Sequence, residues 1–229
     1  LPAQYIPNAG HLWFLGNIFT YVILLLPVFY LVQNGSAFGK KLKAVFSSPL
    51  GLLIVIGALI AEVMIVKPGI FELYAQTWHG YFLGFLAFFF GYCFIISGDR
   101  FWNMLTTWRF VFLAGAVALY VTRLLYYNFK AVDPLMSLES NLWIFSLLAF
   151  GKMYLNKSNR VLSYLSKGAY PIYILHMIFL YWGSIVLFKT SMATELQLVS
   201  LVLFTFAGCF ASYEIIRRMR YVRMFFGLK

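Results

Sequence analysis

Apolar residues fill seven long runs of the chain, and short polar segments separate these runs. Each run approaches the roughly 20 residues that an α-helix needs to cross a bilayer. The runs cover about residues 12–32, 50–66, 78–97, 109–127, 138–155, 170–188 and 196–216. Pro27 predicts a kink in the first run, and Pro49 opens the second. The pattern predicts an all-α polytopic helix bundle with about seven membrane-spanning helices and no soluble domain.

The composition agrees with a chain whose main partner is the lipid bilayer. Of the 229 residues, 62% are hydrophobic and 11% are charged, and the mean hydropathy is +0.83. A soluble domain of this length cannot bury so much apolar surface. The net charge of +11 does not indicate nucleic acid, because the basic residues form short clusters between the apolar runs. Cys93 and Cys209 lie inside such runs, which favours two buried thiols over a disulfide.

The basic residues are unequally divided between the two sides of the predicted bundle. One side carries Lys40, Lys41, Lys43, Arg100, Arg109, Lys152, Lys157, Arg160, Lys167, Arg217, Arg218, Arg220, Arg223 and Lys229. The other carries Lys67, Lys130, Lys189 and, near a helix end, Arg123. The positive-inside rule places the richer side in the cytoplasm. The chain is then expected to start outside at Leu1 and end inside at Lys229, which suggests an odd number of further helices upstream.

A short amphipathic segment, residues 155–167, precedes the sixth run. It is predicted to lie along the cytoplasmic interface. Its cations, Lys157, Arg160 and Lys167, suit a phosphorylated molecule, and anionic lipid headgroups are the simpler partner.

The sixth run carries an ionisable residue, His176. Pro171 stands where the helix is expected to begin, and Tyr173 and His176 share one helix face. An ionisable group in a spanning helix usually faces the protein interior or a watery cavity. A histidine packed between helices and a functional histidine both remain open.

The other polar residues of the runs are few. Glu62 lies about 18 Å from the cytoplasmic end of the second helix. It is expected to be protonated, to face a polar cavity, or to be paired, with Arg123 as a candidate partner for a structural ion pair. Arg123 has the alternative of reaching the membrane surface. Glu214 is expected to pair with the arginines that follow it, and His79 is expected at the outer interface.

The first run opens with His11 and Trp13 at the water boundary. Trp13 is placed as an interfacial anchor, and His11 taken alone is more typical of a surface residue than of a catalyst. The three histidines have no metal-ligand spacing, and the chain contains no phosphate-binding loop, dinucleotide fingerprint or nucleophile elbow. ATPase, redox and serine-hydrolase chemistry therefore have no support in the sequence.

Taken together, three motifs resemble the membrane acyltransferase 3 family along the whole chain. Residues 10–15, Gly-His-Leu-Trp-Phe-Leu, resemble its His-x-Trp-Phe-Leu signature, and residues 164–166 with 170–176 resemble its late Tyr-Pro-Ile-Tyr-Leu-Leu-His signature. Residues 224–229 are similar to the C-terminus of the branch that succinylates osmoregulated periplasmic glucans.

The resemblance implies the C-terminal part, residues 1–229, of one transmembrane acyltransferase domain of about ten helices in the bacterial inner membrane. It implies transfer of a succinyl or acetyl group from cytoplasmic acyl-CoA, a donor substrate rather than a bound cofactor, to a glycan hydroxyl outside. In this interpretation His11 and His176 are auxiliary catalytic candidates. The remaining expected site residues are Trp13, Tyr170, Tyr173, Glu62 and Arg123 for the acceptor substrate and Lys152, Lys157, Arg160 and Lys167 for the donor.

One family element is missing. The family pattern has an Arg followed about eleven residues later by a His on its first helix, and no arginine of this sequence has a histidine at that spacing. The missing helices are then expected in cis or in trans, or the chain is an inactive remnant. A membrane scaffold or subunit, and a transporter-like module lined by Pro27, Glu62 and Arg123, are the alternatives.

Overall fold

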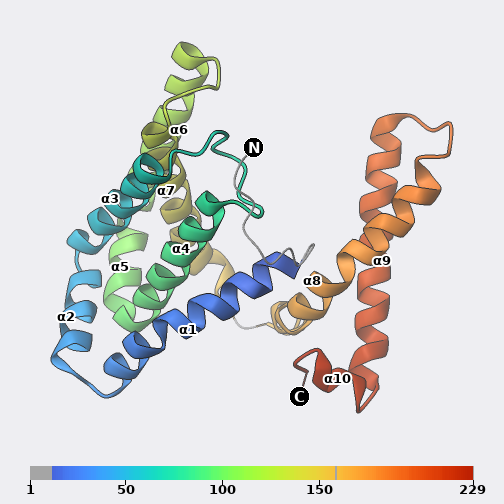
Figure 1. Cartoon of the computed structure of the whole chain (residues 1–229), viewed down its shortest axis with the longest axis horizontal. Helices are drawn as coiled ribbons and strands as arrows, with labels where there is room; N and C mark the ends of the chain where they lie inside the picture. The colour runs from blue at the N-terminus through green and yellow to red at the C-terminus, as the bar shows by residue number, and fades with distance from the viewer. Residues whose placement is uncertain (1–11, 158, 229) are drawn as a thin grey trace. The chain divides into compact units, whose positions relative to one another are not determined.

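The computed structural model describes residues 12–157 and 159–228, which are helical with no strand in these ranges. The chain divides into two compact units, unit 1 (Leu1–Asn156) and unit 2 (Lys157–Lys229) (Figure 1). Unit 1 contains α1 (Trp13–Gln33), α2 (Ala37–Phe46), α3 (Pro49–Val66), α4 (Trp78–Ser97), α5 (Asp99–Thr107), α6 (Arg109–Tyr127), α7 (Asp133–Phe150) and a π-helical turn (Gly151–Leu155). Unit 2 contains α8 (Arg160–Leu187), α9 (Thr194–Arg218) and α10 (Val222–Phe225).

Within the described residues, six helices are long and apolar enough to cross a membrane: α1, α3, α4, α6, α8 and α9. Their exposed side chains are largely apolar, such as Ile65 of α3 and Ile95 of α4, as expected of surfaces that face lipid. The predicted all-α polytopic membrane bundle is confirmed, and the limits of α4 and α6 agree with the predicted ones.

The remaining predicted span, residues 138–155, is helical but differs from the other six. The helix α7 starts earlier, at Asp133, and is interrupted by the π-helical turn. Its buried positions include Glu139, Asn141 and Ser146, so it is too polar to count as a span by composition. It packs against α3 and α6, and these neighbours cover its polar side chains. At about 27 Å, α7 is still long enough to cross the hydrocarbon core.

Two short amphipathic helices, α2 and α5, complete the core of unit 1, and the sequence pattern did not reveal them. Phe46 of α2 and Phe101 and Leu105 of α5 are fully buried. Phe101 stacks on Phe94 of α4, with ring centroids 4.3 Å apart. Gly98 makes this return possible, because its φ of 63° and ψ of −151° belong to a region that only glycine enters readily.

Unit 2 is a helical hairpin whose first helix corrects the predicted start of the sixth span. The segment predicted to lie along the interface and the sixth span form one helix, α8, and Pro171 lies inside it rather than at its start. The helix starts at Asn159, whose side chain accepts a hydrogen bond from the Leu162 amide at 2.6 Å. Figure 1 shows that α8 changes direction along its length, as expected of a helix with an internal proline.

Two glycines bring α8 and α9 close together. Gly208 of α9 faces the ring of Phe179, and Gly183 of α8 faces Leu201 and Phe204. At either glycine a β-carbon would lie less than 3 Å from the side chain opposite. Small residues at facing positions are the usual device by which spanning helices approach each other.

Candidate functional site

An open pocket of about 510 Å³ lies where α8 begins and α9 ends. We call it the basic pocket, because three of its seven lining residues are cations. It is lined by Asn159, Arg160, Ser163, Tyr164, Lys167, Tyr213 and Arg217. Its size falls in the range typical of small-molecule sites, and its charge suits an anion.

The α8 side of this pocket follows directly from helical spacing. Arg160, Ser163, Tyr164 and Lys167 stand at positions i, i+3, i+4 and i+7, which share one helix face. The α9 side contributes residues four positions apart, Tyr213 and Arg217. The pocket is therefore a polar stripe of one helix facing a polar stripe of the other.

Glu214 holds the side chains of this pocket in place. Its carboxylate accepts hydrogen bonds from the Tyr164 hydroxyl at 2.8 Å and from Nε of Arg217 at 2.9 Å. Arg218 is the more distant partner at 3.8 Å, so the predicted pairing of Glu214 with the following arginines is confirmed. Because one carboxylate offsets one arginine, Arg160 and Lys167 leave the pocket with excess positive charge.

Two of the four cations expected to bind the donor line the basic pocket. Arg160 and Lys167 line the basic pocket, whereas Lys157 is exposed ahead of α8 and lines neither described pocket. Lys152 belongs to unit 1, where its ammonium lies 5.6 Å from the centre of the Trp102 ring. The third cation of the basic pocket is Arg217, which the sequence analysis had treated only as part of a basic tail.

Tyr170, Tyr173 and His176 lie further along α8 and do not line the basic pocket. Nδ1 of His176 lies 2.6 Å from the carbonyl oxygen of Tyr173, one turn earlier, and the two rings are 5.7 Å apart. Donation from Nδ1–H to this carbonyl fixes the ring direction. Tyr170 is exposed, next to the turn that contains Gly227.

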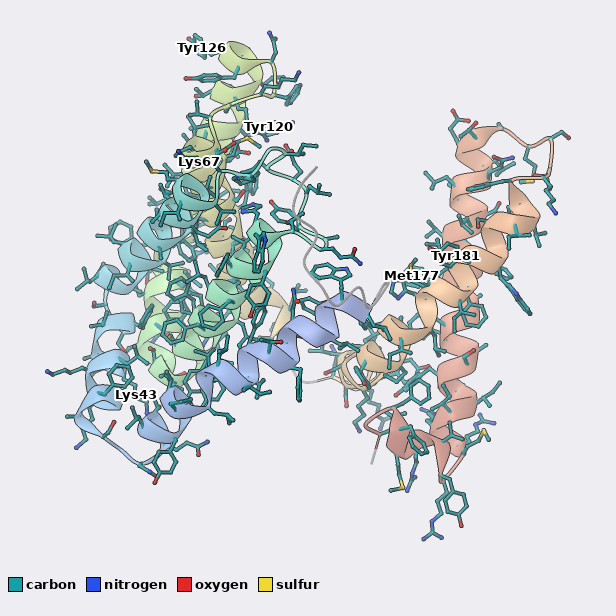
Figure 2. All side chains as sticks on the ribbon, viewed as in Figure 1. Lys43, Lys67, Tyr120, Tyr126, Met177 and Tyr181 are labelled. Carbon is teal, nitrogen blue, oxygen red and sulfur yellow. The ribbon has the colours of Figure 1, made fainter. Side chains whose placement is uncertain are left out.

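In unit 1 the polar side chains gather at the end where α3 stops and α4 starts. Figure 2 shows Lys67, which follows α3, at the same end as Tyr120 and Tyr126 of α6, with Lys43 of α2 at the opposite end. Glu62 and His79 form a buried pair here, with Nδ1 of the imidazole 3.0 and 3.1 Å from the two carboxylate oxygens. His79 is only 2% exposed and Glu62 only 6%. His79 is therefore packed inside unit 1, and its location at the outer membrane interface stays a prediction.

Arg123 pairs with Glu139 of α7, so the expected pair between Glu62 and Arg123 is wrong. Nε and Nη2 of the guanidinium donate to the two carboxylate oxygens of Glu139 at 2.8 and 3.1 Å. A small pocket of about 160 Å³, the loop pocket, opens beside this pair. It is lined by Phe71, Glu72, Tyr74, Arg123, Met136, Glu139 and Ser140.

The loop of residues 67–77 separates the two ion pairs. Rings of Phe71 and Tyr74 lie 5.5 and 5.3 Å from the His79 ring, and the same two residues line the loop pocket. The Thr77 side chain caps α4 by accepting from the Gly80 amide and donates back to the loop carbonyl of Leu73. Burial, and then the carboxylates of Glu72 and Glu62, raise the pKa of the Tyr74 phenol above its usual value.

Trp13 is the first residue of α1, and its ring meets the edge of Phe14 at 6.0 Å. The parallel contacts Tyr21–Tyr81 and Phe29–Tyr92 align α1 with α4, so Trp13 lies at the same end of unit 1 as His79. His11, the other residue expected there, lies outside the described residues.

The fold defines the class of this protein as a multi-pass membrane helix bundle. Comparison with known proteins gives its family. The sequence profile of the acyltransferase 3 family, described as an acyltransferase domain, matches residues 1–214. The chain therefore belongs to the acyltransferase 3 family. Neither the curated proteins nor the solved structures contain a match to this chain.

Proposed function

We propose that this protein transfers an acyl group, succinyl or acetyl, from cytoplasmic acyl-CoA to a hydroxyl of a glycan on the far side of a bacterial inner membrane. Family membership gives the reaction class, a membrane acyltransferase. The donor, the acceptor and the membrane are the further content of this proposal.

The observation that supports the donor is the basic pocket. Coenzyme A carries several phosphate charges, and Arg160, Lys167 and Arg217 converge there with the hydroxyl groups of Ser163 and Tyr164. Arginine forks and lysine ammonium groups are the usual partners of phosphate oxygens. In this proposal the pocket holds the phosphate-bearing part of the donor, and His176, further along the same helix, orients the thioester.

The orientation follows from the distribution of charge. The residues of the basic pocket belong to the side that is rich in lysine and arginine, which the positive-inside rule assigns to the cytoplasm. The loop of residues 67–77, with the loop pocket, then faces the other compartment, together with His11 and Trp13. This arrangement separates a donor side from an acceptor side. The proposed roles of the two histidines fail if His11→Ala and His176→Ala both leave acyl transfer intact.

The experiment is a steady-state assay of the protein in membrane vesicles, with radiolabelled succinyl-CoA or acetyl-CoA and an oligosaccharide acceptor. Arg160→Gln, Lys167→Gln and Arg217→Gln should each raise KM for the donor about tenfold, because each removes one charge-assisted contact to phosphate. Lys41→Gln is the matched control, since it removes an exposed cation on the same side of the membrane without touching the pocket.

Competition with 3′,5′-ADP, which carries the phosphates but no thioester, should weaken in the pocket variants and stay unchanged in the control. Equal donor KM values in all four variants would contradict the proposal that the basic pocket binds the donor. Absence of label transfer by the wild-type protein to any hydroxyl acceptor would reject the function itself.

A further inference from the structure

The loop pocket lies entirely within unit 1, at the end where α6 stops and α7 starts. Helix α7 contributes Met136, Glu139 and Ser140, which stand at positions i, i+3 and i+4 of one helix face. Arg123 comes from the end of α6, and the loop of residues 67–77 supplies the rest of the lining. With a volume of about 160 Å³, the pocket has room for one small ring rather than for a longer molecule.

Two aromatic side chains of the loop line this pocket. The rings of Phe71 and Tyr74 lie 6.4 Å apart and are inclined by 73°, so they present two differently directed faces. Both rings also pack on the buried ring of His79, at 5.5 and 5.3 Å. This backing holds the aromatic faces in place before a ligand binds, which lowers the entropic cost of binding.

The polar groups of the pocket carry charges of both signs. The lining has two carboxylates, Glu72 and Glu139, and one guanidinium, Arg123, which binds both carboxylate oxygens of Glu139. The charge of Glu72, an exposed residue, is therefore in excess. After burial, this carboxylate is the main cause of the raised pKa of the Tyr74 phenol, which places its charge beside that hydroxyl. The loop pocket is thus opposite in charge to the basic pocket.

Such a lining suits a neutral sugar ring. Aromatic faces pack against the C–H face of a pyranose, and carboxylate oxygens accept hydrogen bonds from its hydroxyl groups. The hydroxyl of Ser140 both donates and accepts. An acidic sugar would meet the excess charge of Glu72, and like charges brought together weaken binding. The guanidinium of Arg123 acts against an organic cation in the same way.

We infer that the loop pocket binds a neutral sugar ring of the acceptor and that Glu72 disfavours acidic sugars there. This inference rests on the proposed function and adds to it the acceptor-binding site and its selectivity. The pocket belongs to the end of unit 1 that the proposed orientation turns to the outside, where the glycan is modified. Tyr74 supplies a stacking face, and Glu72 supplies the discrimination by charge.

Binding is measured on the purified protein in detergent by saturation-transfer difference NMR, which requires no acyl transfer. The probes are the methyl glycosides of glucose, galactose and mannose, each with the uronide in which a carboxylate replaces the C6 hydroxymethyl group. At least one neutral glycoside should bind, and its uronide should bind about tenfold more weakly at low salt. High salt should reduce this difference, because it screens the exposed charge of Glu72.

Two variants separate stacking from charge. Tyr74→Ala should weaken binding of the neutral glycoside about tenfold. Its control is Tyr126→Ala, an exposed tyrosine at the same end of unit 1 that lines neither pocket (Figure 2). Glu72→Gln keeps an acceptor oxygen but removes the charge, so the uronide should bind within about threefold of the neutral glycoside. Its control is Glu195→Gln, an exposed carboxylate of α9 that should keep the wild-type preference.

The label-transfer assay connects this site with the reaction. Tyr74→Ala should raise KM for the glycan acceptor about tenfold and leave KM for the donor unchanged. Glu72→Gln, at an exposed position, keeps the test decisive if Tyr74→Ala does not fold.

Three results would overturn the inference and leave the proposed function standing, provided that the wild type transfers label. They are no binding of any neutral glycoside, equal binding of glycosides and uronides, and variants of Tyr74 and Glu72 that match their controls. A wild type that binds a neutral glycoside but transfers no label would instead overturn the proposed function, and the acceptor role of the pocket with it.

Discussion

Gly80 of α4 is the residue against which the backbone of the 67–77 loop packs, at Tyr74. A β-carbon built there would overlap the carbonyl oxygen of Tyr74, a backbone atom that moves only if the whole loop moves. Gly80→Ala should therefore destabilise the protein by about 1–3 kcal/mol, as overpacking usually does, and lower its melting temperature in detergent. The same change at Gly91 of α4 is the control.

Gly91 has no atom within 4 Å of its would-be β-carbon, so Gly91→Ala should be neutral or stabilise the helix by up to about 1 kcal/mol. Thermal unfolding of the two variants in one detergent gives the comparison directly. Equal melting temperatures would mean that the loop does not pack on α4 as the structure shows.

The Arg123–Glu139 pair allows a second test at single residues. The Glu139 side chain is 6% exposed, so Arg123→Met leaves a buried carboxylate without its cation and should cost about 3–5 kcal/mol. The double variant Arg123→Met, Glu139→Met removes both charges and should recover most of that loss. SDS-induced unfolding measures all three proteins together with Thr122→Ala, a half-buried neighbour on α6 whose hydroxyl bonds within its own helix. Additive losses in the double variant would contradict the coupling.

At the scale of single residues, the sequence predicted the depth of the buried charges but not their pairing partners. Helix rise gave the depth of Glu62 and Arg123 correctly, at the same end of the bundle. Depth does not give the direction in which a side chain leaves its helix, and packing places Glu62 against α4 and Arg123 against α7. The burial of His79 was not predicted for a related reason, because the loop that covers it has no apolar pattern of its own.

At the level of elements, α8 and α9 interlock through glycine and phenylalanine. Gly208→Ala would make its β-carbon overlap Cδ1 of Phe179, so the hairpin should lose about 1–3 kcal/mol. Adding Phe179→Ala removes the clash, and the double variant should lose less than the sum of the two single changes. Gly57→Ala on α3, where nothing lies within 4 Å, is the control for unfolding in SDS. A loss no larger than that of Gly57→Ala would contradict the close approach.

Helices were predictable where the sequence has long apolar runs, and less so where it does not. Both α2 and α5 are too short to span a bilayer, and only their buried faces reveal them as parts of the core. The break predicted at Pro171 did not occur, because the residues before it already form a helix capped by Asn159. The sequence analysis identified Arg160 and Lys167 as candidate donor cations, but the residues of α9 that face them, Tyr213 and Arg217, follow only from the structure of the hairpin.

At the scale of the whole molecule, α7 decides the membrane topology. Six apolar spans alone return the chain to the side on which it started, whereas a crossing by α7 makes seven and leaves the two ends on opposite sides. A helix as polar as α7 does not cross lipid alone, but α3 and α6 cover its buried carboxylate and amide groups. With such a crossing, the lysines on either side of α7, Lys130 and Lys157, lie in different compartments.

Cysteine labelling in intact cells tests this crossing. The native thiols, Cys93 and Cys209, are 0% and 1% exposed, so the background of an impermeant maleimide should be low. With seven crossings, Lys130→Cys and Lys189→Cys react in intact cells, and Lys157→Cys and the control Lys41→Cys react only after permeabilisation. If α7 does not cross, Lys157→Cys reacts together with Lys130→Cys, and Lys189→Cys becomes protected. That second pattern would move the basic pocket to the outer side, away from cytoplasmic acyl-CoA, and the proposed division into donor and acceptor sides would fall with it.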